Sequence, residues 1–337
     1  MRAIVQDRYG AIDALRLRDV ERPAPADDEV LIRVRAASVH PDVWHVVAGR
    51  PWALRLMGSG IRRPKDRVPG TDVAGIVESV GAAVTRFRAG EEVFAETIRG
   101  VQWRNGGAFA EYATAPEVGV ALKPSGVGFE EASAVPTAGL IALNNLPQGR
   151  VPPGHRVLVN GAAGGVGAIA LQLAKAYGAH VTGVDHPRKL ALVSSLGADD
   201  VIDYTSEDYT QGGRQWDLIF DVPGNHAFSE TRKALAPGGA YVLIAHDAFG
   251  ASGHRWLGSI PRLLGLMARS AVVPELRGGT FRSPDKRELM ATLAQLLEAG
   301  QLRMVIDRTF PLAEAAAALR YLMSGRPVGR VVITVDT

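Results

Sequence analysis

Gly161, Gly164 and Gly167 stand between an apolar strand and a helix near the middle of the chain. Residues 157–160 read Val-Leu-Val-Asn, and an apolar helical stretch begins behind the glycines. Without side chains the backbone can approach a pyrophosphate closely, and the unpaired N–H groups at the helix start favour its negative charge. The pattern predicts a dinucleotide site, with a purely structural turn as the alternative. The expected contact residues here are Gly161, Ala162, Gly164, Gly165, Val166 and Gly167.

An acidic residue stands where the second strand of such a unit would end. Asp185 follows Val181–Val184, at about the 20-residue spacing at which a carboxylate holds the hydroxyls of the adenosine ribose. That charge would repel a 2′-phosphate, which slightly favours NAD(H). Arg188 and Lys189 pull the other way, because they could hold the phosphate, although they also suit the polar face of a helix. We therefore expect NAD(P)H as cofactor, with NAD(H) slightly favoured and NADP(H) left open.

The elements that position these residues fall into two groups. In the first third, alternating apolar and polar residues and regularly placed glycines predict the short strands of a compact barrel, at Val30–Ala36, Gly70–Val84, Glu92–Ala95 and Gly107–Thr114. From residue 125 short apolar strands alternate with helices, which predicts an α/β fold with a parallel, doubly wound sheet.

The expected strands of that sheet are Arg156–Asn160, His180–Val184, Val201–Asp203, Leu218–Asp221, Tyr241–Ala245 and an edge strand at Leu276–Phe281. The expected helices are Phe129–Leu146, Gly165–Tyr177 and Pro187–Leu196. After them come a helix at Asp285–Glu298 and strands at Met304–Ile306 and Arg330–Val335. We expect this tail to fold back onto the first domain, so that residues 1–124 and 283–337 form one domain and 125–282 the other.

Composition narrows the class of protein. The length of 337 residues suits two domains, and the formal charge is only +3. The basic cluster Arg62, Arg63, Lys65 and Arg67 is interpreted as a solvated loop rather than an anion or nucleic-acid patch, because no aromatic residues are interleaved with it. With no cysteine there is no disulfide, thiolate metal site or cysteine nucleophile. The absence of an apolar signal core or membrane-length run predicts a cytoplasmic protein without membrane or nucleic-acid partners.

Several segments together resemble the medium-chain dehydrogenase/reductase superfamily, and within it the quinone oxidoreductase branch. They are Ala36–Asp42, Gly70–Gly81, Gly107–Tyr112, Gly161–Gly167, Leu196–Asp199, Val201–Tyr204 and Gly329–Ile333, and they span nearly the whole chain. The resemblance implies a GroES-like catalytic domain, a Rossmann domain and a nicotinamide cleft between them. It also implies a homodimer formed by the last Rossmann strands, here Leu276–Phe281.

Zinc members of the superfamily carry a Gly-His-Glu segment, where this chain has Gly70-Thr71-Asp72. Thr71 cannot replace the histidine ligand, whereas His40 stands at the position of the first cysteine ligand. Two scattered ligands do not close a tetrahedral site, so we expect no metal. Without zinc to stabilise developing charge, the acceptor must take hydride readily, as conjugated enones and quinones do.

The resemblance also suggests residues near the nicotinamide. His40 replaces the asparagine of a Ser-Val-Asn-Pro stretch and is our candidate proton donor, since the ordinary pKa of histidine lies near neutrality; the alternative is a buried histidine bonded to backbone. Asp42 either orients His40 or caps a turn. Trp44, Trp52 and Trp103 are candidate walls for a flat substrate, although packing explains each equally well.

Further cofactor residues follow from the family pattern. Thr137 is one, although relatives usually place the nicotinamide-binding threonine where Ile141 stands here. The others are Tyr204, Val222, Gly224, Ala245, Phe281 and Arg330, with His246 as a weaker candidate.

The sequence thus predicts an NAD(P)H-dependent reductase that transfers hydride to a quinone or an α,β-unsaturated carbonyl without zinc. One alternative is an NAD(P)-dependent alcohol dehydrogenase or carbonyl reductase, with a role in biosynthesis as one option. An alternative of another class is a redox-inactive NAD(P)-binding protein.

Overall fold

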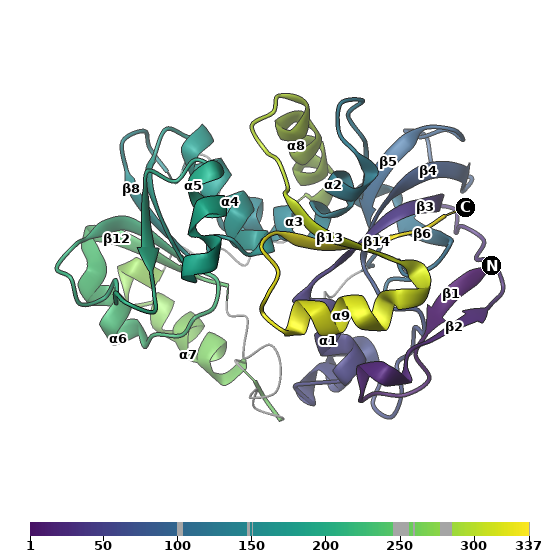
Figure 1. Cartoon of the computed structure of the whole chain (residues 1–337), viewed down its shortest axis with the longest axis horizontal. Helices are drawn as coiled ribbons and strands as arrows, with labels where there is room; N and C mark the ends of the chain where they lie inside the picture. Colours follow the sequence, from purple (N-terminus) through teal and green to yellow (C-terminus); the bar gives the residue numbers. More distant parts are fainter. Residues whose placement is uncertain are drawn as a thin grey trace.

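The structure is a computed structural model of the chain, and it describes residues 1–99, 104–146, 149, 151–244, 256–258, 260–276 and 285–336. The chain forms two bodies, with the parallel sheet at one end and the mostly antiparallel sheet at the other (Figure 1). Helices α3 (Pro136–Asn145) and α8 (Lys286–Glu298) lie between them (Figure 1).

The parallel sheet has the strand order β10-β9-β8-β11-β12. Its strands are β8 (Arg156–Asn160), β9 (His180–Asp185), β10 (Asp200–Asp203), β11 (Trp216–Asp221) and β12 (Leu235–Leu243), and all neighbours run parallel. Because β8 lies centrally and the order reverses beside it, the carboxyl ends of β8 and β11 form the switch point at which such sheets bind ligands. The predicted doubly wound sheet is confirmed.

Helices cover this sheet as the alternating pattern requires. Helices α4 (Gly165–Ala176) and α5 (Leu190–Ser195) pack on its strands, and α6 (Phe228–Thr231) and α7 (Ile260–Ser270) follow later in the chain. Helix α2 (Phe129–Ser133) packs instead on the second sheet, and α3 (Pro136–Asn145) packs against α4 and α8. The single helix expected over Phe129–Leu146 is wrong: it divides before Pro136, which has no N–H to continue the helical hydrogen bonds of α2, although Val135 keeps helical angles. The helix expected from Pro187 starts as a 3₁₀ turn, Pro187–Lys189, before α5 begins.

The second sheet has the order β13-β14-β3-β4-β5-β7, with β6 also paired to β3. Its strands are β3 (Glu29–Val39), β4 (Asp72–Val80), β5 (Glu92–Glu96), β6 (Tyr112–Pro116), β7 (Val120–Leu122), β13 (Ile306–Pro311) and β14 (Arg330–Thr334). Strands β1 (Arg2–Val5) and β2 (Arg16–Asp19) form a separate antiparallel pair. Helices α1 (Pro41–Ala48) and α9 (Ala315–Met323) accompany this sheet.

The C-terminal return is confirmed, because β14 pairs antiparallel with β3, with Val331 opposite Val39. The strand expected at Met304–Ile306 is displaced, since β13 begins at Ile306. Helix α8 (Lys286–Glu298) buries Met290, Leu293 and Leu297 in the core of the parallel-sheet body. It also packs beside β7, so it contacts both bodies. The domain boundaries at residues 124 and 282 stay a prediction.

The predicted sixth strand at Leu276–Phe281 does not begin at Leu276, which ends the 3₁₀ turn Pro274–Leu276 and is buried in a core cluster. Residues 277–281 lie outside the described residues. Within the part of the chain that the structure covers, no helix has the length and apolar character needed to cross a membrane.

Candidate cofactor and active site

The glycine turn leaves β8 and opens α4 as the sequence predicts. Gly161 has φ 80°, and a Cβ there would stand 3.1 Å from Pro223 and 3.3 Å from Val222. A Cβ on Gly167 would lie 2.8 Å from the carbonyl carbon of Gly161. Side chains at these two positions would therefore force the turn away from α4 or from the loop after β11. Helix α4 starts at Gly165, so the N–H groups of its first turn have no acceptor within the helix.

Asp185 ends β9 beside this turn and is buried. One carboxylate oxygen accepts a hydrogen bond from the Ala163 N–H and the other from the His186 N–H, each at 2.8 Å. These bonds fix the carboxylate against the glycine turn. Each oxygen keeps a further lone pair, which is the arrangement needed to accept from ribose hydroxyls.

The other residues expected near the adenosine are Arg188, Lys189 and Tyr204, which follow Asp185 in the chain. Arg188 is exposed in the 3₁₀ turn behind Asp185, where its N–H donates to Nδ1 of His186 at 3.2 Å. Tyr204 is exposed and packs edge to face on His186, with ring centroids 6.0 Å apart. Lys189 is half-buried at the end of the same turn. Arg188 and Lys189 thus stand in the turn that follows Asp185, and their contact with a 2′-phosphate stays a prediction.

The loop after β11 closes the other side of the turn. The buried carboxylate of Asp221 accepts from Asn160 Nδ2 at 2.9 Å, the Gly224 N–H at 3.0 Å and the Tyr241 hydroxyl at 2.8 Å. Burial and the Asp221 charge raise the pKa of Tyr241, so it stays a donor. These bonds fix the loop whose Val222 and Pro223 lie against Gly161, and Gly224 is held by its bond to Asp221.

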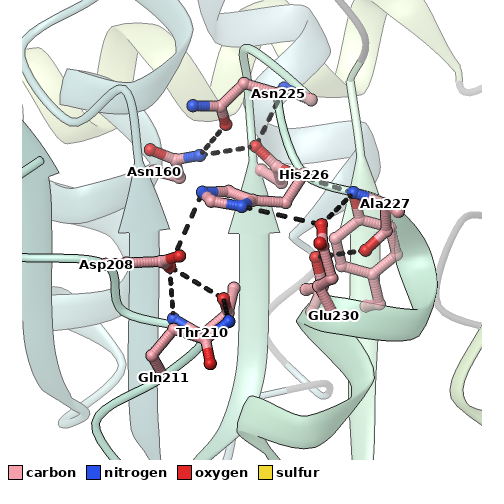
Figure 2. Close-up of polar contacts among 12 residues, drawn as sticks. Asn160, Asp208, Thr210, Gln211, Asn225, His226, Ala227 and Glu230 are labelled. Carbon is pink, nitrogen blue, oxygen red and sulfur yellow. Dashed lines mark hydrogen bonds and ion pairs between the residues drawn. The ribbon is translucent and has the colours of Figure 1, made fainter.

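Figure 2 shows how this loop continues at its outer end. Asn160 also donates to the side-chain oxygen of Asn225 at 3.0 Å. The two ring nitrogens of His226 face one carboxylate each, Asp208 and Glu230, at 3.9 Å (Figure 2). The loop is thus tied to both β8 and α6.

A buried polar group lies where the two bodies meet. We call it the junction cluster, and its members are Ser38, His40, Thr71, Asp72, Glu96, Thr137 and Arg330. They come from the ends of β3, β4, β5, α3 and β14 and the segments beside them. All seven side chains are buried, so their polar atoms must find hydrogen-bond partners within the cluster.

Hydrogen bonds within the junction cluster form a connected path. His40 Nε2 lies 2.7 Å from the Thr71 hydroxyl, which lies 3.2 Å from Asp72 Oδ1 and 3.4 Å from the Thr137 hydroxyl. Thr137 donates to Asp72 Oδ1 at 2.5 Å from its hydroxyl and to Oδ2 at 3.1 Å from its N–H. The Thr137 hydroxyl also lies 3.3 Å from Glu96 Oε1. Burial, then the Glu96 charge, raises the pKa of Asp72 to about 7.

Arg330 links this cluster to the glycine turn. Its Nη2 donates to the Ser38 hydroxyl at 2.7 Å, and a Cβ on Gly165 would stand 2.8 Å from its Cζ. Its Nε is buried without a hydrogen-bond partner among the described residues. Burial lowers the pKa of Arg330, and Asp72 opposes that effect. A buried cation with an unpaired donor beside a helix N-terminus fits an anionic ligand such as a pyrophosphate.

The same residues do not fit a zinc ion. Thr71 occupies the ligand position between Gly70 and Asp72, and its hydroxyl is engaged by His40. Across the described ranges, no group of three or more His, Cys, Asp or Glu side chains stands close enough to hold a metal ion.

The remaining predicted residues separate into three cases. Asp42 lies in the first turn of α1, with Oδ2 3.9 Å from His40 Nδ1, which suits either an orienting or a turn role. Trp44 packs in the core of the β3–β4 body, which favours the packing interpretation, while Trp52 is half-buried against Trp256 with ring centroids 6.0 Å apart. Trp103, Ala245, His246 and Phe281 lie outside the described residues.

Sequence reasoning missed Glu96, Ser38 and Lys286 as site residues. Glu96 follows three apolar residues at the end of the strand Glu92–Glu96, and an acid placed after such a run is a signal that could have been used. Lys286 pairs with Glu96 at 2.5 Å from a segment 190 residues away, for which the sequence offers no local signal.

Comparisons with known proteins agree with this architecture. The alcohol dehydrogenase GroES-like domain family matches residues 26–125, and a family described as zinc-binding dehydrogenase matches residues 196–333. The chain is 31% identical to the chloroplast envelope quinone oxidoreductase homolog of Arabidopsis thaliana, covering 99% of this chain and 98% of that protein. It is 32% identical to the NADPH-dependent alkenal/one oxidoreductase, chloroplastic, of the same plant, covering 99% and 79%.

Among solved structures, the quinone oxidoreductase from Coxiella burnetii superposes with a TM-score of 0.81 at 27% identity, covering 100% of this chain and 99% of that one. A GroES-like sheet joined to a Rossmann sheet defines the chain as a protein of the alcohol dehydrogenase fold. It belongs to the medium-chain dehydrogenase/reductase superfamily, in its quinone oxidoreductase-like part.

Proposed function

We propose that this protein is an NAD(P)H-dependent oxidoreductase that reduces a quinone or an α,β-unsaturated carbonyl without a metal. The observation that carries the proposal is the contact between Arg330 of the junction cluster and Gly165 at the start of α4. Because Arg330 belongs to the junction cluster, that contact places the glycine turn next to the cluster that contains His40. The names of the plant relatives, a quinone oxidoreductase homolog and an alkenal/one oxidoreductase, support the substrate class.

Different residues of the chain bind the cofactor and supply the proton. The first turn of α4 and Arg330 bind the pyrophosphate, while Asp185 holds the adenosine ribose. The bound nicotinamide supplies hydride. His40 supplies the proton or a hydrogen bond to the substrate oxygen, because its ring is buried beside the polar path through Thr71. Asp42 positions the His40 ring from its other nitrogen.

Cofactor preference is proposed on the same contacts. The buried, doubly hydrogen-bonded Asp185 carboxylate favours NADH slightly, because a 2′-phosphate would stand against it. Exposed Arg188 beside it can pair with that phosphate, so NADPH also remains a substrate.

The test is steady-state oxidation of NADH and of NADPH with a panel of quinones, enones and simple aldehydes. We expect turnover with quinones or enones and little with unconjugated aldehydes, because the described residues form no cluster of ligands for a metal that would polarise an isolated carbonyl. Chelator treatment serves as the control and should leave the rate unchanged. Turnover confined to alcohols and unconjugated carbonyls would favour the alcohol dehydrogenase alternative. Dinucleotide binding without any turnover would favour the redox-inactive one.

Two further expectations remain proposals. The homodimer would form through residues 276–281, of which only Leu276 is described, and sedimentation velocity tests it. The cytoplasmic location is tested by fractionation.

A further inference from the structure

The junction cluster contains two buried carboxylates that the proposed function does not use. Asp72 is fully buried and the side chain of Glu96 is 4% exposed, and both bond to the same Thr137 hydroxyl. Two buried negative charges on one hydroxyl repel each other strongly. Such a pair becomes tolerable when it shares a proton.

The path around these carboxylates reaches from His40 to the protein surface. From His40 Nε2 it runs through the Thr71 hydroxyl to Asp72, then through the Thr137 hydroxyl to Glu96. Lys286 then pairs with Glu96 Oε2 at 2.5 Å, and its side chain is 25% exposed. The donor and acceptor atoms of each step lie 2.5 to 3.3 Å apart, and every intermediate group can both accept and donate a proton.

We propose that Thr71 and Asp72 form a proton relay that recharges His40, and that Glu96 with Lys286 refills it from solvent. The relay rests on the proposed function, because it needs a reduction that consumes a proton. It assigns new roles to Thr71, Asp72, Glu96 and Lys286, none of which needs to touch the substrate.

The step balances as follows. Hydride forms a C–H bond at the β-carbon of the enone, and the electron pair of the C=C bond moves toward the carbonyl oxygen to give an enolate. The Nδ1–H bond of His40 breaks and its proton forms a C–H bond at the α-carbon of the enolate, while Nε2 takes the Thr71 hydroxyl proton and Thr71 takes one from the Asp72 carboxyl. The product has gained one hydride and one proton, Asp72 is left as a carboxylate, and His40 carries its proton on Nε2. A solvent proton entering by Lys286 and Glu96 restores Asp72, and a half-turn of the His40 ring returns a proton to the nitrogen that faces the substrate.

Electrostatics suit Asp72 to this role. The charged and titratable groups that face it are Glu96 from β5, Arg330 from β14 and His40 from the end of β3, while Lys286 of α8 faces Glu96. Burial and Glu96 raise its pKa to about 7, against the opposing bonds from Thr137. A group that titrates near the working pH can both release and regain a proton.

Loss of the relay should affect the reduction of enones and of quinones differently. Protonation of an enolate on carbon is slow without a general acid, whereas a hydroquinone oxygen exchanges protons rapidly with water. We expect Thr71→Val to lower enone kcat roughly 10- to 100-fold, within the range that a positioned proton donor supplies. Quinone kcat and the dinucleotide Kd should change less than about twofold, because hydride transfer and cofactor contacts are untouched. Thr334→Val, which removes a hydroxyl bonded to Phe310 O in the same sheet, is the matched control.

A pH profile gives a second, independent readout. Enone kcat should fall as the pH rises through about 7, since the relay needs protonated Asp72. Glu96→Gln removes the like charge and should move that midpoint to lower pH. The relay is overturned if Thr71→Val lowers kcat equally for enones and quinones, or if it leaves enone kcat unchanged. It is also overturned if Glu96→Gln leaves the pH midpoint of enone kcat unchanged. Wild-type protein that reduces neither class refutes the proposed function itself, and the relay with it.

Discussion

Gly167→Ala tests the dinucleotide site most directly. The added Cβ would stand 2.8 Å from the Gly161 carbonyl carbon and 3.1 Å from the Ala162 Cα, with the Gly161 oxygen nearer still. All three atoms are backbone, so no side chain can move aside. Because non-bonded carbons settle at about 3.5–4.0 Å, α4 must withdraw from the turn by roughly 1 Å.

The expected effects on stability and on binding differ in size. Overpacking costs about 1–3 kcal/mol, and the better helix propensity of alanine returns about 1 kcal/mol, so the net loss of unfolding free energy is small. Moving the first turn of α4 removes charge-assisted hydrogen bonds to the pyrophosphate, worth about 1.5–3 kcal/mol each. We therefore expect both NADH and NADPH to bind roughly 10- to 100-fold more weakly.

The assay is titration of nucleotide fluorescence, with urea unfolding of the same samples. Gly265→Ala is the control, because a Cβ there meets nothing within 4 Å inside α7. It should stabilise the fold by up to about 1 kcal/mol and leave both affinities unchanged. A folded Gly167→Ala protein that binds either dinucleotide as tightly as wild type would refute the assignment of this turn.

Three other predictions follow from single contacts. Asp185→Ser should weaken NADH binding and tighten NADPH binding in paired titrations, because the carboxylate bonded to Ala163 and His186 is lost. Unchanged Kd values would show that Asp185 does not determine the cofactor preference. In Asp72→Asn, the pH dependence of unfolding free energy should flatten. The folded-state pKa is raised from 3.8 to about 7, so wild-type stability is fully present below pH 3.8 and falls as pH rises toward 7, by up to about 4 kcal/mol in total; parallel curves in urea unfolding would contradict this. Tyr241→Phe should cost about 1–2 kcal/mol in the same assay, since Asp221 keeps two of its three donors, and no measurable loss would argue against that bond.

The sequence was sufficient for the parallel sheet and its glycine turn, because both depend on local patterns. Arg156–Asn160 is a strand with the predicted bounds, and α4 begins at the predicted Gly165. Strand and helix ends were less predictable: Pro136 broke one expected helix, and Leu276, the one described residue of Leu276–Phe281, is not in a strand. Apolar periodicity registers neither a proline break nor a short 3₁₀ turn.

The junction cluster was harder to predict for a different reason. His40 and Asp72 were recognisable by comparison with zinc-ligand positions, yet their present partners come from distant segments. Glu96 reaches Thr137 across 41 positions, and Lys286 reaches Glu96 across 190. Such pairings depend on how the two sheets pack, and residue spacing carries no information about that packing.

Arg330 shows why the cofactor site requires the whole chain. The glycine turn is complete within residues 160–167, and it would bind a pyrophosphate by helix N–H groups alone. The buried cation beside Gly165, however, arrives on β14, which is positioned only by pairing with β3. The same pairing sets Ser38, which holds Arg330, and the β3 strand that ends next to His40. Cation, proton donor and cofactor helix are therefore aligned by one strand pair, so a substitution that shifts the β3–β14 register should weaken dinucleotide binding although it touches no residue of the Rossmann sheet.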